Sequence, residues 1–474
     1  MTSLKRRTVA SLIASYISQF STSAANFAIK IVLARLLLPA EWGIYAEAML
    51  VVLVADTFTD VGLSQHVMRE KHRPYGNVLL IRLVLSVIAI LLIETFADHL
   101  DFLSPKVIQP ARVLAPLILL RAVGSIPRTY MDRELMVHRS LVPQLLGLVT
   151  MGSISILLAY KGLGVYALIL GTLAQELVFS ALMWIVVGRG MVIQLTFDHT
   201  KSLILGSRYL FLIAVVGFVL QQGDIAITGT ILNPAQVGLY AMAYTIIALT
   251  SKLVETAIYR VVYPLFCQYA DQVQALGRIY VTTTLAMVAI EAPIYFFLLF
   301  NSRFFVSVTL GEKWMPAAQL LAALSVAGIV NPFTTFGIEV LRATKRDKML
   351  TIASVAGAAS LMTFGSILTL RYGAMGMVAA NYIVISGVVT VITLLKMIPT
   401  YIRDLTGKLM VVYAVSFSLA VASYFAFMGH GFFQNAMSMV AALVSWLIFY
   451  RAYGVRMVRE MLELLDGHRE YEAV

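Results

Sequence analysis

The chain has 474 residues, of which 60% are hydrophobic and 13% are charged, whereas soluble domains are roughly half apolar and about a quarter charged. This composition excludes an ordinary soluble domain, and apolar runs of about 20 residues along the whole chain predict a polytopic membrane protein. In such a protein the net charge of +11 indicates topology and anionic lipid as a partner, not nucleic acid. The one cysteine, Cys267, excludes an intrachain disulfide and a cysteine-based metal cluster.

Fourteen apolar segments follow one another along the chain. We expect an all-α fold, because a segment that spans lipid must satisfy its own backbone hydrogen bonds. The first segment follows Lys5-Arg6-Arg7 and is too long for a cleavable signal peptide, so we interpret it as an uncleaved span. The predicted spans cover residues about 9–34, 42–65, 77–97, 113–130, 141–160, 164–187, 204–232, 238–262, 279–300, 316–341, 349–370, 375–397, 408–428 and 433–450. A charged tail, residues 451–474, follows the last span.

Lysine and arginine are distributed unevenly over the connections between these spans. With both termini placed in the cytoplasm, the cytoplasmic side holds 25 of them and the opposite side holds seven. Cytoplasmic loops carry the excess of basic residues in membrane proteins. The sequence therefore predicts a multi-pass membrane protein with both termini in the cytoplasm.

A short stretch occurs twice. Residues 37–48 read LLPAEWGIYAEA and residues 232–243 read LNPAQVGLYAMA, with seven identities at a constant offset of 195. Each copy lies between two apolar segments, and its proline and glycine predict a tight helical hairpin. Asp60 and Glu255 also match at this offset, and residues 164–167 resemble residues 376–379. We interpret the chain as two related bundles of six spans, whose even number gives both the same topology. The predicted division is 1–198 for the N-terminal lobe, 199–402 for the C-terminal lobe, 403–450 for two added spans and 451–474 for the tail.

Polar residues follow one face of several spans. In the first span they recur at steps of three and four and include Asn26 and Lys30. Small polar residues in membranes also pack helices together, so helix packing is the alternative to a water-accessible lumen. The eighth span repeats the pattern with tyrosines, for which packing is again the alternative to sugar contact. The residues predicted to bind substrate in the lumen are Asn26, Lys30, Arg121, Tyr240, Tyr244, Lys252 and Tyr259.

Acidic residues also occur within the predicted spans. A charge at the bilayer centre costs about 2.5–3.5 kcal/mol on insertion scales, so each needs a partner or water. Asp224, Glu255 and Glu291 are the candidates for coupling transport to a cation. The alternative is that such residues form internal ion pairs, for example Lys252 with Glu255.

Signals of an enzyme are absent from the sequence. There is no glycine-rich phosphate-binding loop followed by Lys and Ser or Thr, and the seven histidines lack metal-ligand spacing. No connection is long enough for a polar catalytic domain. We therefore predict a transporter with no catalytic residues, no metal site and no cofactor.

The hairpin 34–45 is followed by residues 60–64, and later by Gly238-Leu239-Tyr240 and by residues 310–314. Together these motifs resemble the polysaccharide-transport flippases of the multidrug/oligosaccharidyl-lipid/polysaccharide exporter superfamily. The resemblance covers nearly the whole chain, although each motif is short and their order carries most of the weight.

This resemblance implies two six-helix lobes around a V-shaped cavity, with two added C-terminal spans. It implies that the protein moves undecaprenyl-diphosphate-linked oligosaccharide to the outer leaflet for exopolysaccharide, capsule or lipopolysaccharide O-antigen assembly, with a polysaccharide polymerase complex as a candidate partner. A cation-coupled multidrug exporter of the same fold and a membrane scaffold that transports nothing are the alternatives.

Overall fold

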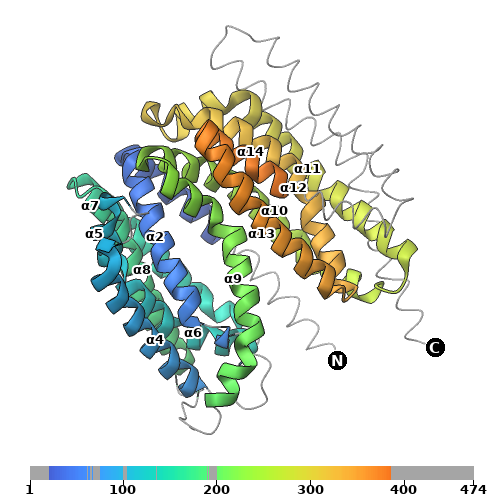
Figure 1. Ribbon diagram of the computed structural model, residues 1–474, viewed down its shortest axis with the longest axis horizontal. Helices are drawn as coiled ribbons and strands as arrows, with labels where there is room; N and C mark the ends of the chain where they lie inside the picture. Colours follow the sequence, from blue (N-terminus) through green and yellow to red (C-terminus); the bar gives the residue numbers. More distant parts are fainter. Residues whose placement is uncertain are drawn as a thin grey trace. The chain divides into compact units, whose positions relative to one another are not determined.

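The computed structural model describes residues 21–60, 62–64, 67, 75–99, 104–134, 136–188, 191 and 200–385. This part of the chain is helical and confirms the predicted all-α class (Figure 1). The chain divides into two compact units, Met1–Ala241 and Met242–Val474. The predicted lobe boundary at residue 198 rests on the sequence repeat and stays a prediction. The predicted spans at 408–428 and 433–450 and the tail lie outside the described residues.

The first unit consists of consecutive helices, three of which begin at a proline. Pro39, Pro105 and Pro116 stand at the first positions of their helices, where the missing N–H costs no hydrogen bond and the fixed φ favours the helix. The helices are residues 21–36, α2 (Pro39–Asp60), α4 (Tyr75–Phe96), η1 (Ala97–His99), α5 (Pro105–Leu114), α6 (Pro116–Arg133), η2 (Val137–Ser140), α7 (Leu141–Tyr160), α8 (Val165–Val187) and α9 (Thr200–Ile231). The first two turns of α10 (Pro234–Gln268) belong to the same unit.

The interior of the first unit lies where α2 packs against α5 and where α6 and α7 pack against α8. Ala48 and Val52 of α2 contact a row of fully buried aliphatic side chains from α5, including Ala111 and Leu114. Small residues at these contacts let two helix backbones approach closely, which is the usual basis of helix association in membranes. This packing holds α2 in the middle of the unit, with the next helices around it.

The second unit contains the rest of α10 and five further elements. They are α11 (Val273–Thr309), η5 (Glu312–Trp314), α12 (Ala317–Ala343), α13 (Asp347–Tyr372) and α14 (Ala374–Ile385). Its core lies between α10, α11 and α12, where Phe266 and Phe336 meet edge to face with ring centroids 6.5 Å apart. Helix α11 contains Pro293 and a non-helical residue, Asn301, and is longer at both ends than the predicted span 279–300.

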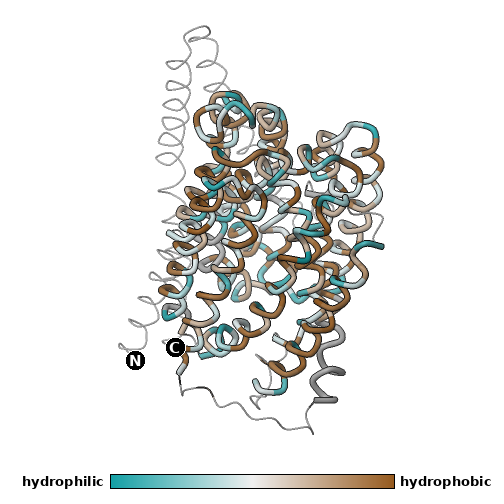
Figure 2. Tube along the Cα trace, turned by 90° about the vertical axis from the view of Figure 1, so that its left-hand side faces the viewer, coloured by the Kyte–Doolittle hydropathy of each residue, from teal (hydrophilic) through white to brown (hydrophobic). Residues whose placement is uncertain are grey.

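Nine helices in the described part of the chain are long and apolar enough to cross a membrane. Hydrophobic positions predominate along these helices, and hydrophilic positions are interspersed among them (Figure 2). Many large apolar side chains are exposed on the surface, for example Leu91 and Leu157, each 57% exposed. A soluble protein rarely exposes so much apolar surface, whereas lipid covers it in a membrane protein. The structure is therefore that of a multi-pass membrane protein.

Candidate functional site

The two copies of the repeated stretch have the same local structure. In the first, the backbone N–H of Leu38 donates to Oε2 of Glu41 at 2.6 Å. In the second, the N–H of Asn233 donates to Oε1 of Gln236 at 3.4 Å, and the N–H of Gln236 donates back to the Asn233 side chain at 3.0 Å. A side chain at the third helical position that bonds the N–H of the capping residue is a capping box. The repeat in the sequence is thus a repeat of helix starts at α2 and α10.

These two helix starts contact each other through a glycine from each copy. A Cβ atom placed on Gly43 would lie 1.7 Å from the carbonyl oxygen of Pro234, and one placed on Gly238 would lie 1.9 Å from the carbonyl oxygen of Pro39. The contact is reciprocal, because Gly43 and Gly238 occupy the same position in the repeat, as do Pro39 and Pro234. Only glycine permits so close an approach of two backbones. We call this contact, formed by Pro39, Gly43, Pro234 and Gly238, the glycine clasp.

The tyrosines that follow the two glycines are also equivalent, and both point into the protein. The hydroxyl of Tyr45 hydrogen-bonds Oγ1 of Thr172 on α8 at 2.8 Å. Tyr240 is fully buried, and its hydroxyl donates to Oδ2 of Asp224 on α9 at 2.8 Å. Tyr240 and Asp224, predicted for substrate and for cation coupling respectively, are therefore partners in this structure, and neither is exposed to a lumen here. Their predicted roles stay predictions.

A network of charged side chains joins α2, α4, α6 and α8. Arg82 of α4 is 5% exposed and contacts two carboxylates of α2, with Nη2 3.0 Å from Oδ1 of Asp56 and Nη1 3.0 Å from Oδ1 of Asp60. The second oxygen of Asp56 faces Arg121 of α6, 3.6 Å from its Nη1. Glu176 of α8 lies within Coulombic reach of Arg121. The network thus consists of alternating charges, and the Asp56 carboxylate bridges two arginines.

Exposure differs between the two arginines. The Arg121 side chain is 27% exposed, against 5% for Arg82, and the distance from Arg121 to Asp56 is longer than that from Arg82 to Asp56. At a rise of 1.5 Å per residue, Arg121 lies about 18 Å along α6 from Arg133, which is more than half of the roughly 30 Å hydrocarbon core. Arg121 is therefore a partly accessible cation deep within a membrane span, whereas Arg82 is a buried cross-link between helices.

The second unit contains a separate polar cluster. Oε1 of Glu255 on α10 accepts hydrogen bonds from Asn331 at 3.0 Å and from Thr335 at 3.2 Å, both on α12. Glu291 of α11 is fully buried within Coulombic reach of Glu255, and its carboxylate oxygens have no hydrogen-bond partner among the described residues. The hydroxyls of Ser251 and Tyr295 bond each other at 2.6 Å beside them. The structure thus brings Glu255 and Glu291 together, and Asp224 lies in the other unit.

The remaining predicted residues have the following positions. Asn26 and Lys30 are partly exposed on the helix at residues 21–36. Tyr244 is partly exposed and Lys252 is exposed on α10. The side chain of Tyr259, also on α10, lies outside the described residues.

Sequence reasoning missed three of these features. Arg82 is the single basic residue of a strongly apolar helix, which is a signal for a buried partner, but its partners lie 22 and 26 residues earlier. The amide donor Asn331 gave no signal. Glu47 of α2 is 1% exposed, and its position inside both a predicted span and the repeated stretch 37–48 was the signal that was available.

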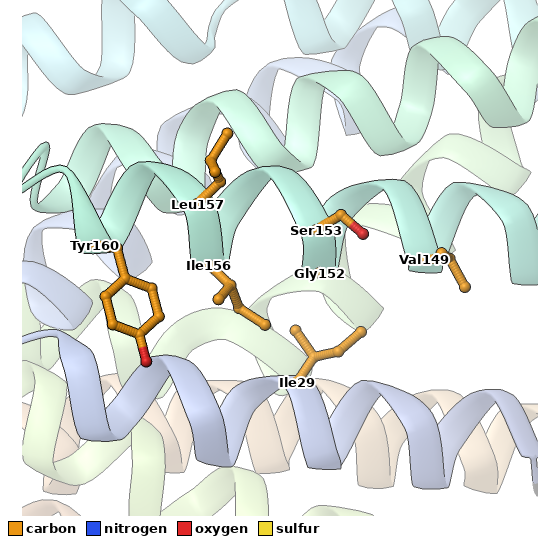
Figure 3. Close-up of a pocket in the computed structure, with 7 residues that line it drawn as sticks. All are labelled: Ile29, Val149, Gly152, Ser153, Ile156, Leu157 and Tyr160. Carbon is orange, nitrogen blue, oxygen red and sulfur yellow. The ribbon is translucent and has the colours of Figure 1, made fainter.

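A cavity of about 440 Å³ lies between α7 and the helix at residues 21–36 (Figure 3). Ile29 and Ile156 point toward each other across the space between the two helices, and Tyr160 lies at one end of it. Its other lining residues are Val149, Gly152, Ser153 and Leu157. Because the lining contains no charged side chain, this cavity offers nothing to bind a phosphorylated headgroup.

The comparisons with known proteins agree on one family. Residues 32–319 match the family described as "Polysaccharide biosynthesis protein". Succinoglycan biosynthesis transport protein ExoT of Rhizobium meliloti (strain 1021) is 24% identical over 335 residues, which cover 68% of this chain and 66% of ExoT. Teichuronic acid biosynthesis protein TuaB of Bacillus subtilis (strain 168) is 24% identical over 168 residues, which cover 30% of this chain and 34% of TuaB. The matches span less than two thirds of each relative.

Two solved structures show the fold. Lipid II flippase MurJ in an inward closed conformation has a TM-score of 0.77 at 15% identity, over 93% of this chain and 99% of MurJ. An inward-facing multidrug resistance MATE family transporter of the MOP superfamily has a TM-score of 0.60 at 17% identity, over 81% of this chain and 99% of the transporter. At these identities the likeness establishes the fold alone, which is the multi-pass helical fold of the MOP superfamily.

Proposed function

The chain belongs to the polysaccharide biosynthesis protein family, and on that premise we propose that it is a flippase. It moves undecaprenyl-diphosphate-linked oligosaccharide repeat units to the outer leaflet of a bacterial inner membrane for surface polysaccharide assembly. The names of ExoT and TuaB, which refer to succinoglycan biosynthesis transport and teichuronic acid biosynthesis, support a polysaccharide as the end product. MurJ is named a flippase of lipid II, which supports a lipid-linked substrate for this fold.

The proposal includes the finer architecture. Fourteen spans form two six-helix lobes, at 1–198 and 199–402, and two added spans lie at 403–450, with both termini in the cytoplasm. From residue 21 to residue 385 the structure describes twelve successive helices, with α5 and α6 counted as one, and they follow the order of the first twelve predicted spans, which supports this count. The asymmetry of lysine and arginine between the two sides supports the orientation.

The observation that carries the proposal is the partly exposed guanidinium of Arg121 at membrane depth. An arginine in hydrocarbon is costly and marks a pathway when it faces water or a polar substrate. Its planar donors match the oxygens of a diphosphate, which a lysine meets only as a point charge. Arg121 lies 3.6 Å from Asp56, so its guanidinium N–H groups can still donate to a substrate. Arg82 holds the same carboxylate more closely, at 3.0 Å.

The charge network suggests how the headgroup is bound and released. When the diphosphate reaches Arg121, its oxygens replace the weak contact with Asp56, and Asp56 keeps its bond to Arg82. No charge is then left without a partner, which is the condition for moving ions within a low dielectric. In the proposed orientation the membrane potential favours outward transfer by about 2.3 kcal/mol per negative charge per 100 mV. Rocking of the two lobes supplies alternating access, as expected for repeats of this kind.

Coupling to a cation is assigned to the polar cluster of the second unit. Two adjacent carboxylates that repel each other favour binding of a proton or another cation between them. Glu255 has amide and hydroxyl partners, and Glu291 has none among the described residues. We therefore place coupling at Glu255 and Glu291 ahead of Asp224, whose carboxylate already accepts the Tyr240 hydroxyl.

A cation-coupled multidrug exporter is the second candidate, because the fold also occurs in a multidrug resistance transporter. Such an exporter would favour an acidic site for cationic drugs. The network alternates positive and negative charges, and its partly exposed cation, Arg121, favours an anionic substrate instead.

The test uses a deletion strain of the source organism, complemented with the wild type or with variants of the chain. Deletion is expected to abolish surface polysaccharide and to accumulate lipid-linked repeat units, and Arg121→Gln is expected to restore less than a tenth of the wild-type polymer. Arg121→Lys keeps the positive charge but lacks the planar pair of guanidinium donors, so it should restore an intermediate amount of polymer.

Arg112→Gln is the matched control, since Arg112 is another arginine of the first unit that contacts carboxylates, but its partners Glu94 and Asp98 are exposed and lie outside the charge network. It should complement fully at equal protein abundance. Normal polysaccharide with raised drug sensitivity in the deletion strain would contradict the flippase proposal and support the exporter. Normal polymer levels in the Arg121→Gln strain would show that Arg121 does not act in transport.

A further inference from the structure

Glu47 of α2 lies one helical turn after Gly43 and therefore directly beside the glycine clasp. It is 1% exposed, and neither carboxylate oxygen has a hydrogen-bond partner among the described residues. The side chain packs on Gly229 of α9, where an added Cβ would lie 3.1 Å from Cγ and 3.5 Å from Cδ of Glu47. The helix that ends just before Pro234 thus covers the carboxylate whenever the clasp is formed.

No ion pair or hydrogen bond to the buried carboxylate of Glu47 is formed in the described part of the first unit. Lys106 is exposed at the start of α5, and the other ionisable groups on the elements packed against α2 have partners elsewhere. These pairs include Arg82 and Arg121 with Asp56, Arg112 with Glu94 and Asp98, Glu176 with Arg121 and Arg128, Asp132 with Arg128, Arg133 with the Val67 carbonyl, Asp224 with Tyr240, and Tyr45 with Thr172. On α2 itself, Glu41 accepts the N–H of Leu38 and Asp60 contacts Arg82, and Lys30 and Arg35 of the preceding helix have contacts of their own.

An ionised carboxylate without water, hydrogen bond or counter-charge is far more costly to bury than a neutral carboxylic acid. A metal cation would need several oxygen ligands, and the described part of the chain has no group of three or more His, Cys, Asp or Glu residues that could hold one. A proton needs no further ligand. The occupant that this site accepts is therefore a proton.

We propose that Glu47 is a proton-binding site that controls the glycine clasp. With Glu47 protonated, α9 packs against α2 and the two helix starts close on each other. When Glu47 loses its proton, the charge requires water, so Gly229 must move away and the clasp opens. This proposal rests on the proposed function in one respect. In the predicted orientation the clasp lies at the outer ends of the spans, so opening the clasp opens the transport pathway to the outer side of the membrane.

The coupling has a defined magnitude and direction. Closing the clasp binds one proton. The ratio of closed to open protein therefore falls up to tenfold for each unit by which pH rises. This dependence holds over the pH range in which Glu47 is protonated when the clasp is closed and ionised when it is open. Low pH closes the clasp and high pH opens it.

The test measures the separation of the two helix starts directly. Spin labels are attached to Leu38→Cys and Gln236→Cys, both exposed positions, in a chain whose native cysteine is removed by Cys267→Ser. The purified full chain is reconstituted in lipid nanodiscs, and the distance distribution is recorded by pulsed electron paramagnetic resonance between pH 5 and pH 9. No lipid-linked sugar is needed, so the result does not depend on the substrate.

The wild type is expected to show a short distance at low pH and a growing longer population as pH rises. Glu47→Gln mimics the neutral acid and should stay short at every pH. Gly43→Ala, which cannot form the clasp, should stay long at every pH. Glu94→Gln, at an exposed carboxylate of α4, should keep the wild-type response.

A wild-type distance that does not change with pH would overturn the proposal, and so would a Glu47→Gln chain that responds like the wild type. If Glu47→Gln does not fold, a short and pH-sensitive distance in Gly43→Ala would overturn it as well. Failure of the flippase proposal would appear separately, as normal surface polysaccharide in the deletion strain.

Discussion

Two arginines of the first unit each contact two carboxylates, but only one of these ion-pair sites is buried. Arg82 is 5% exposed, and its partners Asp56 and Asp60 are 22% and 27% exposed. Arg112 is 16% exposed, and its partners Glu94 and Asp98 are 47% and 60% exposed. The two sites therefore test how far burial, rather than the number of ion pairs, decides the stability of this protein.

Replacing Arg82 by glutamine leaves two carboxylates facing each other without their main counter-charge. Removing one partner of a buried ion pair costs about 3–5 kcal/mol. The first unit has 241 residues, and for a unit of 150–250 residues each kcal/mol lowers the Tm by about 2–4 °C. Arg82→Gln is therefore expected to lower the Tm by about 6–20 °C. Arg112→Gln breaks exposed pairs worth about 0–1 kcal/mol and should lower it by no more than about 4 °C.

The assay is thermal unfolding of the purified chain in one detergent, followed by intrinsic fluorescence, with the two variants and the wild type side by side. A third variant combines Arg82→Leu with Asp60→Asn, which removes one charge of each sign and leaves Asp56 paired with Arg121. It should recover at least half of the loss, because neutral polar groups are less costly to bury than unpaired charges. Equal shifts for Arg82→Gln and Arg112→Gln would refute the reasoning, as would a double variant less stable than Arg82→Gln.

Two further predictions concern the neighbourhood of the glycine clasp. Gly43→Ala places a Cβ 1.7 Å from a backbone oxygen and should lower the stability measured in thermal unfolding by about 1–3 kcal/mol. Its control is Gly217→Ala on α9, where nothing lies within 4 Å of the added Cβ, so this change should be neutral or stabilising by up to about 1 kcal/mol. Equal Tm values for the two variants would contradict the contact at Gly43. Tyr240→Phe removes the hydroxyl that donates to the buried Asp224 carboxylate and should lower the stability by about 1–3 kcal/mol. Adding Asp224→Asn should recover part of this stability. A Tyr240→Phe chain as stable as the wild type would show that this hydrogen bond is not formed.

The membrane spans and the repeat could be predicted because both are properties of the chain itself. A spanning segment satisfies its backbone within one helix, so an apolar run of sufficient length predicts its structure without its neighbours. Pro39 and Pro234 predicted the tight hairpins for a local reason as well, and α2 and α10 begin at these prolines, earlier than the predicted spans at about 42 and 238. The predicted hairpins, the order of the helices and the polysaccharide family all followed from such signals, and residues 32–319 confirm the family.

The partners of the polar side chains were decided by tertiary structure. Asp56 pairs with Arg82, 26 residues later, and with Arg121 on another helix; the sequence showed only that each needed a partner or water. Tyr240 had the pattern of a lumen residue, yet it is buried against Asp224. The sequence by itself thus determined the helices, the repeat and the class of membrane protein, because in lipid each helix satisfies its backbone hydrogen bonds within its own segment. Which charges are paired, which glycines touch and why Glu47 is buried against Gly229 depend on how helices far apart in the chain pack, and that packing exists only in the folded protein.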